Sequence, residues 1–175
     1  IQEAGGVKTA NAKKIKRSQL FGIEFDREIY ALACANMLIH KDGKTYLEQL
    51  DARYEAASIW MARQGITKVL MNPPYENKYG CMTIVENVLD SVPARTACAF
   101  ILPDKKLEKA SKTQIKRILS HHRLKKIIKL PEDLFFGVGV TTSIFVFETG
   151  VAQSGKEIFA CYMETDGLAT VKNKG

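Results

Sequence analysis

Four consecutive residues, Asn72-Pro73-Pro74-Tyr75, carry groups suited to chemistry on a planar amine. The two prolines have no backbone N–H and stiffen the turn, so the carbonyl groups there point in fixed directions. The Asn72 side chain and the Pro73 carbonyl can then both accept hydrogen bonds from one amino group. Tyr75 adds an aromatic face on which a base can stack. The simpler interpretation is a rigid turn that follows a strand.

An exocyclic amine such as adenine N6 matches these two acceptors. Its lone pair is delocalised into the ring, which makes the nitrogen a poor nucleophile. Two acceptors on its two N–H bonds favour a more pyramidal nitrogen, whose lone pair is then free to attack a sulfonium methyl group. The segment therefore predicts methyl transfer to a planar amine.

A second candidate site is acidic and lies near the beginning of the chain. Glu24 stands in the run GIEFD (residues 22–26), which ends the first expected strand. Nucleoside-binding α/β folds use an acidic residue at the carboxyl end of a strand to bind ribose hydroxyls. Acidic residues also commonly cap the helix that follows a strand, as Asp26 is expected to do. The run alone does not choose between these two roles.

The elements that must position these residues follow from alternating apolar and amphipathic runs. This alternation predicts an α/β fold with a doubly wound sheet. The expected strands are residues 19–25, 45–49, 68–71, 96–102, 126–130, 142–147 and 158–162. The expected helices are residues 27–40, 52–64, 82–91 and 105–121.

Two of these elements are expected to be buried. The helix over residues 27–40 is apolar on nearly all sides, which is typical of a buried helix. The run Val69-Leu70-Met71 is continuously apolar, as expected of a central strand that is covered on both faces. Asn72 then follows a central strand, where doubly wound sheets bind their ligands.

Composition limits the class of protein. The chain has 175 residues, of which 46% are hydrophobic and 26% charged, as in soluble globular domains. No run of about eighteen apolar residues occurs, so we expect no membrane span and no membrane partner. The four cysteines lie far apart without a Cys-x-x-Cys pair, which favours a reduced cytoplasmic setting and no metal site.

The charge is strongly positive, at +7, and is concentrated in one region. Residues 105–129 contain ten Lys or Arg against one acidic residue, Glu108. Lys105, Lys109, Lys112 and Lys116 recur at helical spacing and would form one stripe. A solvated helix face and a stripe that neutralises nucleic-acid phosphates are both consistent with this pattern. Charge alone does not choose between them.

Four segments read in order resemble a known family: LFGIEFDREIYALACANMLIH (20–40), NPPY (72–75), FILPDKKLEK (100–109) and LPEDLFFGVGVTTSIFVFETG (130–150). Together they resemble the methylation subunit of type I restriction–modification systems, an adenine-N6 DNA methyltransferase family. The resemblance covers nearly the whole chain. It implies a Rossmann-like fold that binds S-adenosylmethionine and methylates an adenine flipped out of DNA, without a metal or covalent enzyme intermediate. DNA and the specificity and restriction subunits of a type I complex are the implied partners.

The resemblance also implies roles for single residues. The NPPY segment would hold the target adenine, and Glu24 would bind the ribose of the cofactor. Asp51, in LEQLDAR, would contact the cofactor's adenine, although the family more often has Gly-Asp where this chain has Leu50-Asp51. Phe135 or Phe136 would stack on the flipped base together with Tyr75. Ordinary core packing is the alternative for each phenylalanine.

One departure from the family concerns its cofactor loop. Family members carry an acidic-Pro-x-x-Gly-x-Gly loop just before the part that resembles Ile1 onward, where this chain has only Gly5-Gly6. We therefore expect part of a single catalytic domain without its first strand, divided into a connector (1–18), a core (19–148) and a C-terminal extension (149–175). Two alternatives stay open: a non-catalytic fragment that docks DNA or a subunit, and an NPPY methyltransferase that acts on a protein glutamine or an rRNA base.

Overall fold

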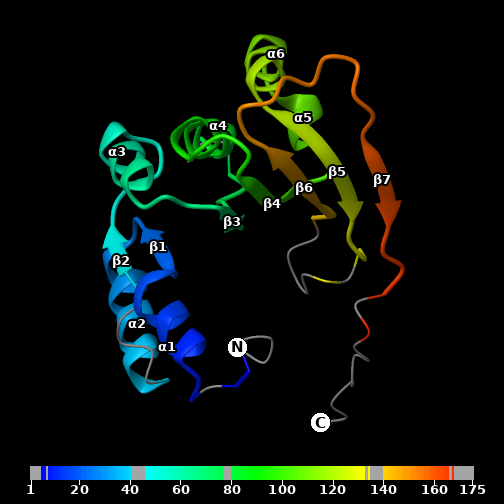
Figure 1. The fold of residues 1–175 in the computed structure, drawn as a ribbon. Helices are drawn as coiled ribbons and strands as arrows, with labels where there is room; N and C mark the ends of the chain where they lie inside the picture. Colours follow the sequence, from blue (N-terminus) through cyan, green and yellow to red (C-terminus); the bar gives the residue numbers. More distant parts are fainter. Residues whose placement is uncertain are drawn as a thin grey trace. The chain divides into compact units, whose positions relative to one another are not determined.

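The computed structural model describes residues 5, 6, 8–40, 46–76, 80–132, 134, 140–165 and 167. The chain divides into two compact units, Ile1–Gln64 and Gly65–Gly175 (Figure 1). The first unit contains α1 (Ala10–Ser18), β1 (Phe21–Glu24), α2 (Arg27–Ile39), β2 (Tyr46–Gln49) and α3 (Glu55–Arg63). The second contains β3 (Lys68–Met71), α4 (Cys81–Ser91), β4 (Ala97–Pro103), α5 (Lys106–Lys109), α6 (Lys112–His121), β5 (Arg123–Lys129), β6 (Thr142–Glu148) and β7 (Phe159–Tyr162). Every helix in these described ranges is too short or too polar to cross a membrane.

The first unit is built on a parallel pair of strands, β1 and β2, which places Glu24 opposite Gln49. Helix α2 connects the two strands, as parallel pairing requires a crossover. The Asp26 carboxylate begins α2 by accepting hydrogen bonds from the backbone N–H groups of Glu28 (2.8 Å) and Ile29 (3.0 Å). Asp26 is therefore the N-cap that the sequence predicts.

One expectation for this unit, the burial of α2, is wrong. None of its residues is buried, and Leu32, Leu38 and Ile39 are 65%, 68% and 76% exposed. The physical reason is that a two-stranded sheet is too narrow to cover a helix that is apolar on all sides. Helix α1, over residues 10–18, was not among the expected helices, and it begins after Thr9, whose side chain accepts a hydrogen bond from the backbone N–H of Ala12 (3.2 Å).

The second unit contains a five-stranded mixed sheet in the order β3-β4-β6-β5-β7 (Figure 1). β3 and β4 are parallel, β6 is antiparallel to both of its neighbours, and β7 is parallel to β5. Phe100 and Phe147 from adjacent strands pack edge to face, with ring centroids 6.0 Å apart. Val85, Val88 and Leu89 of α4 are also buried. These side chains form the hydrophobic core of the unit.

Strand β3 differs from the expectation of a central strand covered on both faces. It stands at the end of the sheet order and pairs with β4 alone among the described strands. Its residues alternate between exposed and half-buried, and Leu70 is 87% exposed. An apolar run indicates what the side chains favour, but it does not supply the neighbours that would bury them.

The long helix expected over residues 105–121 is two helices, α5 and α6. Ala110 and Ser111 separate them with ψ angles of 158° and 130°, which are not helical. Serine is favoured at helix starts, and α6 begins directly after Ser111. Lys105 and Lys109 therefore belong to the N-cap and the end of α5, and Lys112 and Lys116 to α6, so the four lysines do not follow one continuous helix.

Candidate functional site

The NPPY turn follows β3 at the carboxyl ends of the two parallel strands β3 and β4. Met71 pairs with Phe100, so β4 continues beside the turn as far as Pro103. Asn72 and Pro74 are exposed, Pro73 is buried, and Tyr75 is half-buried. This carboxyl edge is where open α/β sheets bind ligands, as the sequence predicted for the segment.

Two side-chain hydrogen bonds hold the turn. The Tyr75 hydroxyl donates to Asn72 Oδ1 at 2.7 Å, and the Lys106 ammonium group donates to the Tyr75 carbonyl at 2.7 Å. Burial raises the pKa of the Tyr75 hydroxyl, with a smaller contribution from Cys81, so the hydroxyl stays protonated near neutral pH. An amide oxygen has two lone pairs, and Tyr75 uses one of them. The other lone pair of Asn72 Oδ1 can accept from a ligand.

A cavity of about 480 Å³ adjoins the turn, a volume typical of small-molecule and base-sized sites. Its lining includes Tyr75, Cys81, Thr83, Lys105, Lys106, Lys109, Gln114 and Val140. Lys105 and Lys109 are exposed, whereas Lys106 is half-buried. The cavity therefore combines an aromatic ring with three cationic side chains, a combination that suits a nucleotide. Phe135 and Phe136 lie outside the described residues, so their stacking role stays a prediction.

Glu24 and Asp51 lie at the carboxyl ends of adjacent parallel strands in the first unit. The two ends are tied together by a hydrogen bond from the backbone N–H of Leu50 to the Glu24 carbonyl (3.1 Å). Glu24 Oε1 accepts from the backbone N–H of Asp26 at 2.8 Å. Among the described residues, no group binds Oε2, which leaves an acceptor for a ribose hydroxyl. The chemistry of Glu24 therefore fits the predicted cofactor role.

Asp51 is already engaged by Arg53. The Arg53 guanidinium donates to both carboxylate oxygens at 2.5–3.0 Å, and the Arg53 backbone N–H donates to Oδ1 at 3.0 Å. These hydrogen bonds hold the pKa of the Asp51 carboxyl below its usual value. The same guanidinium lies over the rings of Phe25 (5.6 Å) and Tyr54 (5.5 Å). An adenine contact at Asp51 would have to share an oxygen with Arg53, so the predicted role fits less well than that of Glu24.

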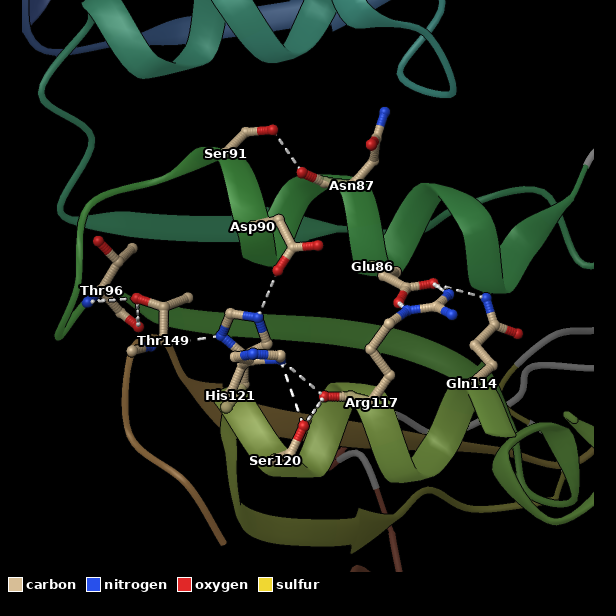
Figure 2. A network of polar contacts seen from close by, with 12 residues as sticks. Glu86, Asn87, Asp90, Ser91, Thr96, Gln114, Arg117, Ser120, His121 and Thr149 are labelled. Carbon is tan, nitrogen blue, oxygen red and sulfur yellow. Dashed lines mark hydrogen bonds and ion pairs between the residues drawn. The ribbon is translucent and has the colours of Figure 1, made fainter. Parts of the chain in front are cut away.

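A polar network between α4 and α6 was not visible in the sequence (Figure 2). The carboxylate of Glu86, on α4, is buried and binds the Arg117 guanidinium and, at 2.9 Å, the Gln114 amide of α6. Burial by itself raises the pKa of Glu86, but the hydrogen bonds from Arg117 and Gln114 outweigh it and hold the pKa below its usual value. A buried carboxylate with these partners stays charged and fixes α6 against α4.

A second polar contact joins the ends of the same helices. The His122 ring is buried, with Nε2 placed 2.8 Å from Asp90 Oδ1 and Nδ1 accepting from the backbone N–H of Gly150 at 3.3 Å. A second cavity, of about 440 Å³, borders this network. No group of three His, Cys, Asp or Glu residues within the described ranges is arranged to hold a metal ion.

Comparisons with known proteins agree with this geometry. The sequence model of the N-6 DNA methylase family matches residues 1–98 and 85–174. The type II restriction enzyme and methyltransferase RM.BcgI from Heyndrickxia coagulans is 29% identical over 174 residues, which cover 93% of this chain and 27% of that protein. The chain thus spans about a quarter of the length of this curated relative.

Two solved structures resemble the fold. The M protein of the type I restriction enzyme EcoKI has a TM-score of 0.68 at 17% identity, over 86% of this chain and 35% of that one. A candidate class I S-adenosylmethionine-dependent methyltransferase from Listeria monocytogenes has a TM-score of 0.63 at 17% identity, over 91% of this chain and 57% of that one. These similarities confirm the predicted Rossmann-like methyltransferase fold, and the matches together confirm the resemblance seen in the sequence. The chain belongs to the N-6 DNA methylase family.

Proposed function

We propose that this chain takes part in the transfer of a methyl group from S-adenosylmethionine to N6 of an adenine flipped out of DNA. The observation that carries the proposal is the exposed Asn72 carboxamide, whose oxygen is held by the Tyr75 hydroxyl beside a lysine-lined cavity. The family match supports DNA as the nucleic acid. Duplex DNA hides adenine N6, so the base has to leave the stack, at a cost of a few kcal/mol.

In this mechanism Asn72 Oδ1 uses its remaining lone pair to accept one N6 hydrogen, and the Pro73 carbonyl accepts the other. Both acceptors favour the pyramidal nitrogen that attacks, so their hydrogen bonds strengthen as the reaction proceeds. S-adenosylmethionine, when bound, supplies the electrophilic methyl group. The methylated amine then loses one proton to water, because neither an amide oxygen nor a backbone carbonyl is a base at neutral pH. The flipped adenine stacks on the Tyr75 ring, which offsets about 1–3 kcal/mol of the flipping cost.

Charge supports a nucleic-acid substrate over a protein one. Lys105 and Lys109 at the cavity, and Lys112 and Lys116 on α6, are all exposed. Exposed lysines beside a base-sized cavity neutralise backbone phosphates, and such binding weakens steeply as salt increases. The division of these lysines between α5 and α6 does not remove the positive charge from this region.

The cofactor and the partners follow from the same proposal. Glu24 binds the ribose hydroxyls of S-adenosylmethionine through its available carboxylate oxygen, and Asp51 approaches the cofactor's adenine. By resemblance to the type I methylation subunits, the protein acts with a specificity subunit, which selects the DNA sequence, and with a restriction subunit. These assignments rest on the resemblance and on the chemistry of the two carboxylates.

The test is methyl transfer from labelled cofactor to unmethylated DNA, RNA or protein by the full-length protein. Asn72→Ala is expected to lower the single-turnover rate on DNA by about two to three orders of magnitude, as for loss of a transition-state hydrogen-bond partner. Asn36→Ala, at an exposed position of α2, is the matched control and should leave the rate unchanged.

A rate loss of less than tenfold for Asn72→Ala would contradict the role of its carboxamide. Transfer to RNA or protein but not to DNA would support an NPPY methyltransferase with another substrate. DNA binding without any transfer would support a docking module.

A further inference from the structure

Lys106 differs from the other lysines of the region in where its charge lies. It is half-buried, whereas the neighbouring Lys105 and Lys109 are exposed. Its ammonium group donates to the Tyr75 carbonyl at 2.7 Å, across 31 residues of sequence. It also lies close enough to Cys81 to lower the pKa of that thiol, against the larger effect of burial, which raises it. The charge of Lys106 therefore points toward the NPPY turn.

The NPPY turn has few backbone N–H donors of its own, and Lys106 adds a donor at the Tyr75 carbonyl. Pro73 and Pro74 have no N–H groups, so the turn has fewer backbone hydrogen bonds available to stabilise it than an ordinary turn. A charged donor to a partly buried carbonyl makes a stronger hydrogen bond than a neutral one. The Tyr75 hydroxyl donates to Asn72 Oδ1 at 2.7 Å, and Lys106 donates to the backbone carbonyl of the same tyrosine. Tyr75 therefore links Lys106 to the acceptor atom of Asn72.

We propose that Lys106 is a positioning residue for methyl transfer, which fixes the Tyr75 backbone and through it the direction of the Asn72 carboxamide. The proposal rests on the proposed function of the NPPY turn. Productive geometry tolerates little error, and a displacement of about 1 Å at a reacting group can cost about a hundredfold in rate. Lys106 contributes by preventing that displacement and does not touch the reacting atoms. The competing role is direct neutralisation of a DNA phosphate, which would act on binding and not on the saturated rate.

The test compares Lys106→Met and Lys106→Arg with a matched control in the full-length protein. Lys156 makes the same kind of contact elsewhere in the second unit, with its ammonium group donating to the Ala152 carbonyl at 2.8 Å. Lys156→Met therefore removes an equal charge and a lysine–carbonyl hydrogen bond at an exposed place away from the turn. The measurements are the single-turnover rate at saturating DNA and cofactor, the DNA dissociation constant, and hydrogen–deuterium exchange of a peptide spanning residues 70–76.

Lys106→Met is expected to lower the saturated rate by about 10- to 100-fold, with the DNA dissociation constant within about threefold of wild type. Exchange in the 70–76 peptide should rise in Lys106→Met and not in Lys156→Met. Lys106→Arg, which keeps charged donors, should recover most of the rate. A normal saturated rate with weakened DNA binding would overturn the proposal in favour of a phosphate contact.

Failure of the proposed function gives a different pattern. In that case wild type transfers no methyl to DNA, yet the exchange measurement still reports whether Lys106 holds the turn. Unchanged exchange in Lys106→Met would overturn the positioning role whatever the substrate is.

Discussion

Tyr75 has two separable contributions, a ring and a hydroxyl, and Tyr75→Phe removes only the hydroxyl. That hydroxyl donates to Asn72 Oδ1 at 2.7 Å and remains protonated because burial raises its pKa. A neutral hydrogen bond of this kind contributes about 0.5–1.5 kcal/mol. If the whole of this free energy serves to orient the Asn72 carboxamide, the single-turnover rate falls by about 2- to 12-fold in Tyr75→Phe. Stacking is retained because the ring is unchanged.

The assay measures single-turnover methylation and, separately, fluorescence of 2-aminopurine placed at the target position. Tyr75→Phe should slow methylation but leave the fluorescence increase on flipping intact. Tyr75→Ala should reduce both, because stacking contributes about 1–3 kcal/mol per base. Tyr162→Phe, at an exposed tyrosine of β7, is the control. A Tyr75→Phe rate equal to wild type would refute the reasoning, because the hydroxyl would then not orient the carboxamide. A rate above wild type would also refute it, because the hydroxyl would then compete with the substrate amine for Asn72 Oδ1.

The cofactor site and the α4–α6 network each give a further prediction. Glu24→Gln, which keeps the size of the side chain but loses its charge, should weaken S-adenosylmethionine binding by about tenfold or more in calorimetric titration; unchanged affinity would remove Glu24 from the cofactor site. Arg117→Met should lower the urea midpoint at pH 7, because buried Glu86 keeps Gln114 but loses its charged partner. The pKa of Glu86 is lowered in the folded state, so its stabilising effect is present above the usual glutamate pKa and is lost as pH falls through the lowered value. The difference between Arg117→Met and wild type should therefore shrink in acid; a difference that stays constant would mean that the ion pair does not stabilise the fold.

Elements were predictable from sequence where local patterning decides them. The strand Lys68–Met71 was predicted with its observed bounds, and Asp26 caps α2 as expected, because apolar runs and capping residues act over a few positions. The break between α5 and α6 was missed because Ala110-Ser111 contains neither Gly nor Pro, the usual breakers. Helix α1 was missed although Thr9 offers a capping side chain directly before it.

Burial and contacts were less predictable, because they depend on neighbours that are distant in sequence. The apolar character of Leu32 and Leu70 predicted burial, yet both side chains are largely exposed. The position of Asn72 at the end of a strand followed from the apolar run before it, whereas the Lys106–Tyr75 hydrogen bond joins residues 31 positions apart. The Asp51–Arg53 pair is an exception, since a spacing of two residues could have indicated it.

The placement of the NPPY turn depends on how α4 and α6 are joined. α4 begins at Cys81, which lies near enough to Tyr75 to help raise the pKa of its hydroxyl, and near enough to Lys106 for that charge to lower the pKa of the Cys81 thiol. Glu86, farther along α4, is held by two side chains of α6, and α6 follows α5 after two residues. The contacts that fix α6 against α4 therefore also limit where Lys106 can lie relative to the turn. Sites that must be held to within about 0.5 Å need support of this kind from rigid elements. An NPPY sequence without such support would keep the acceptors of the motif but not their direction.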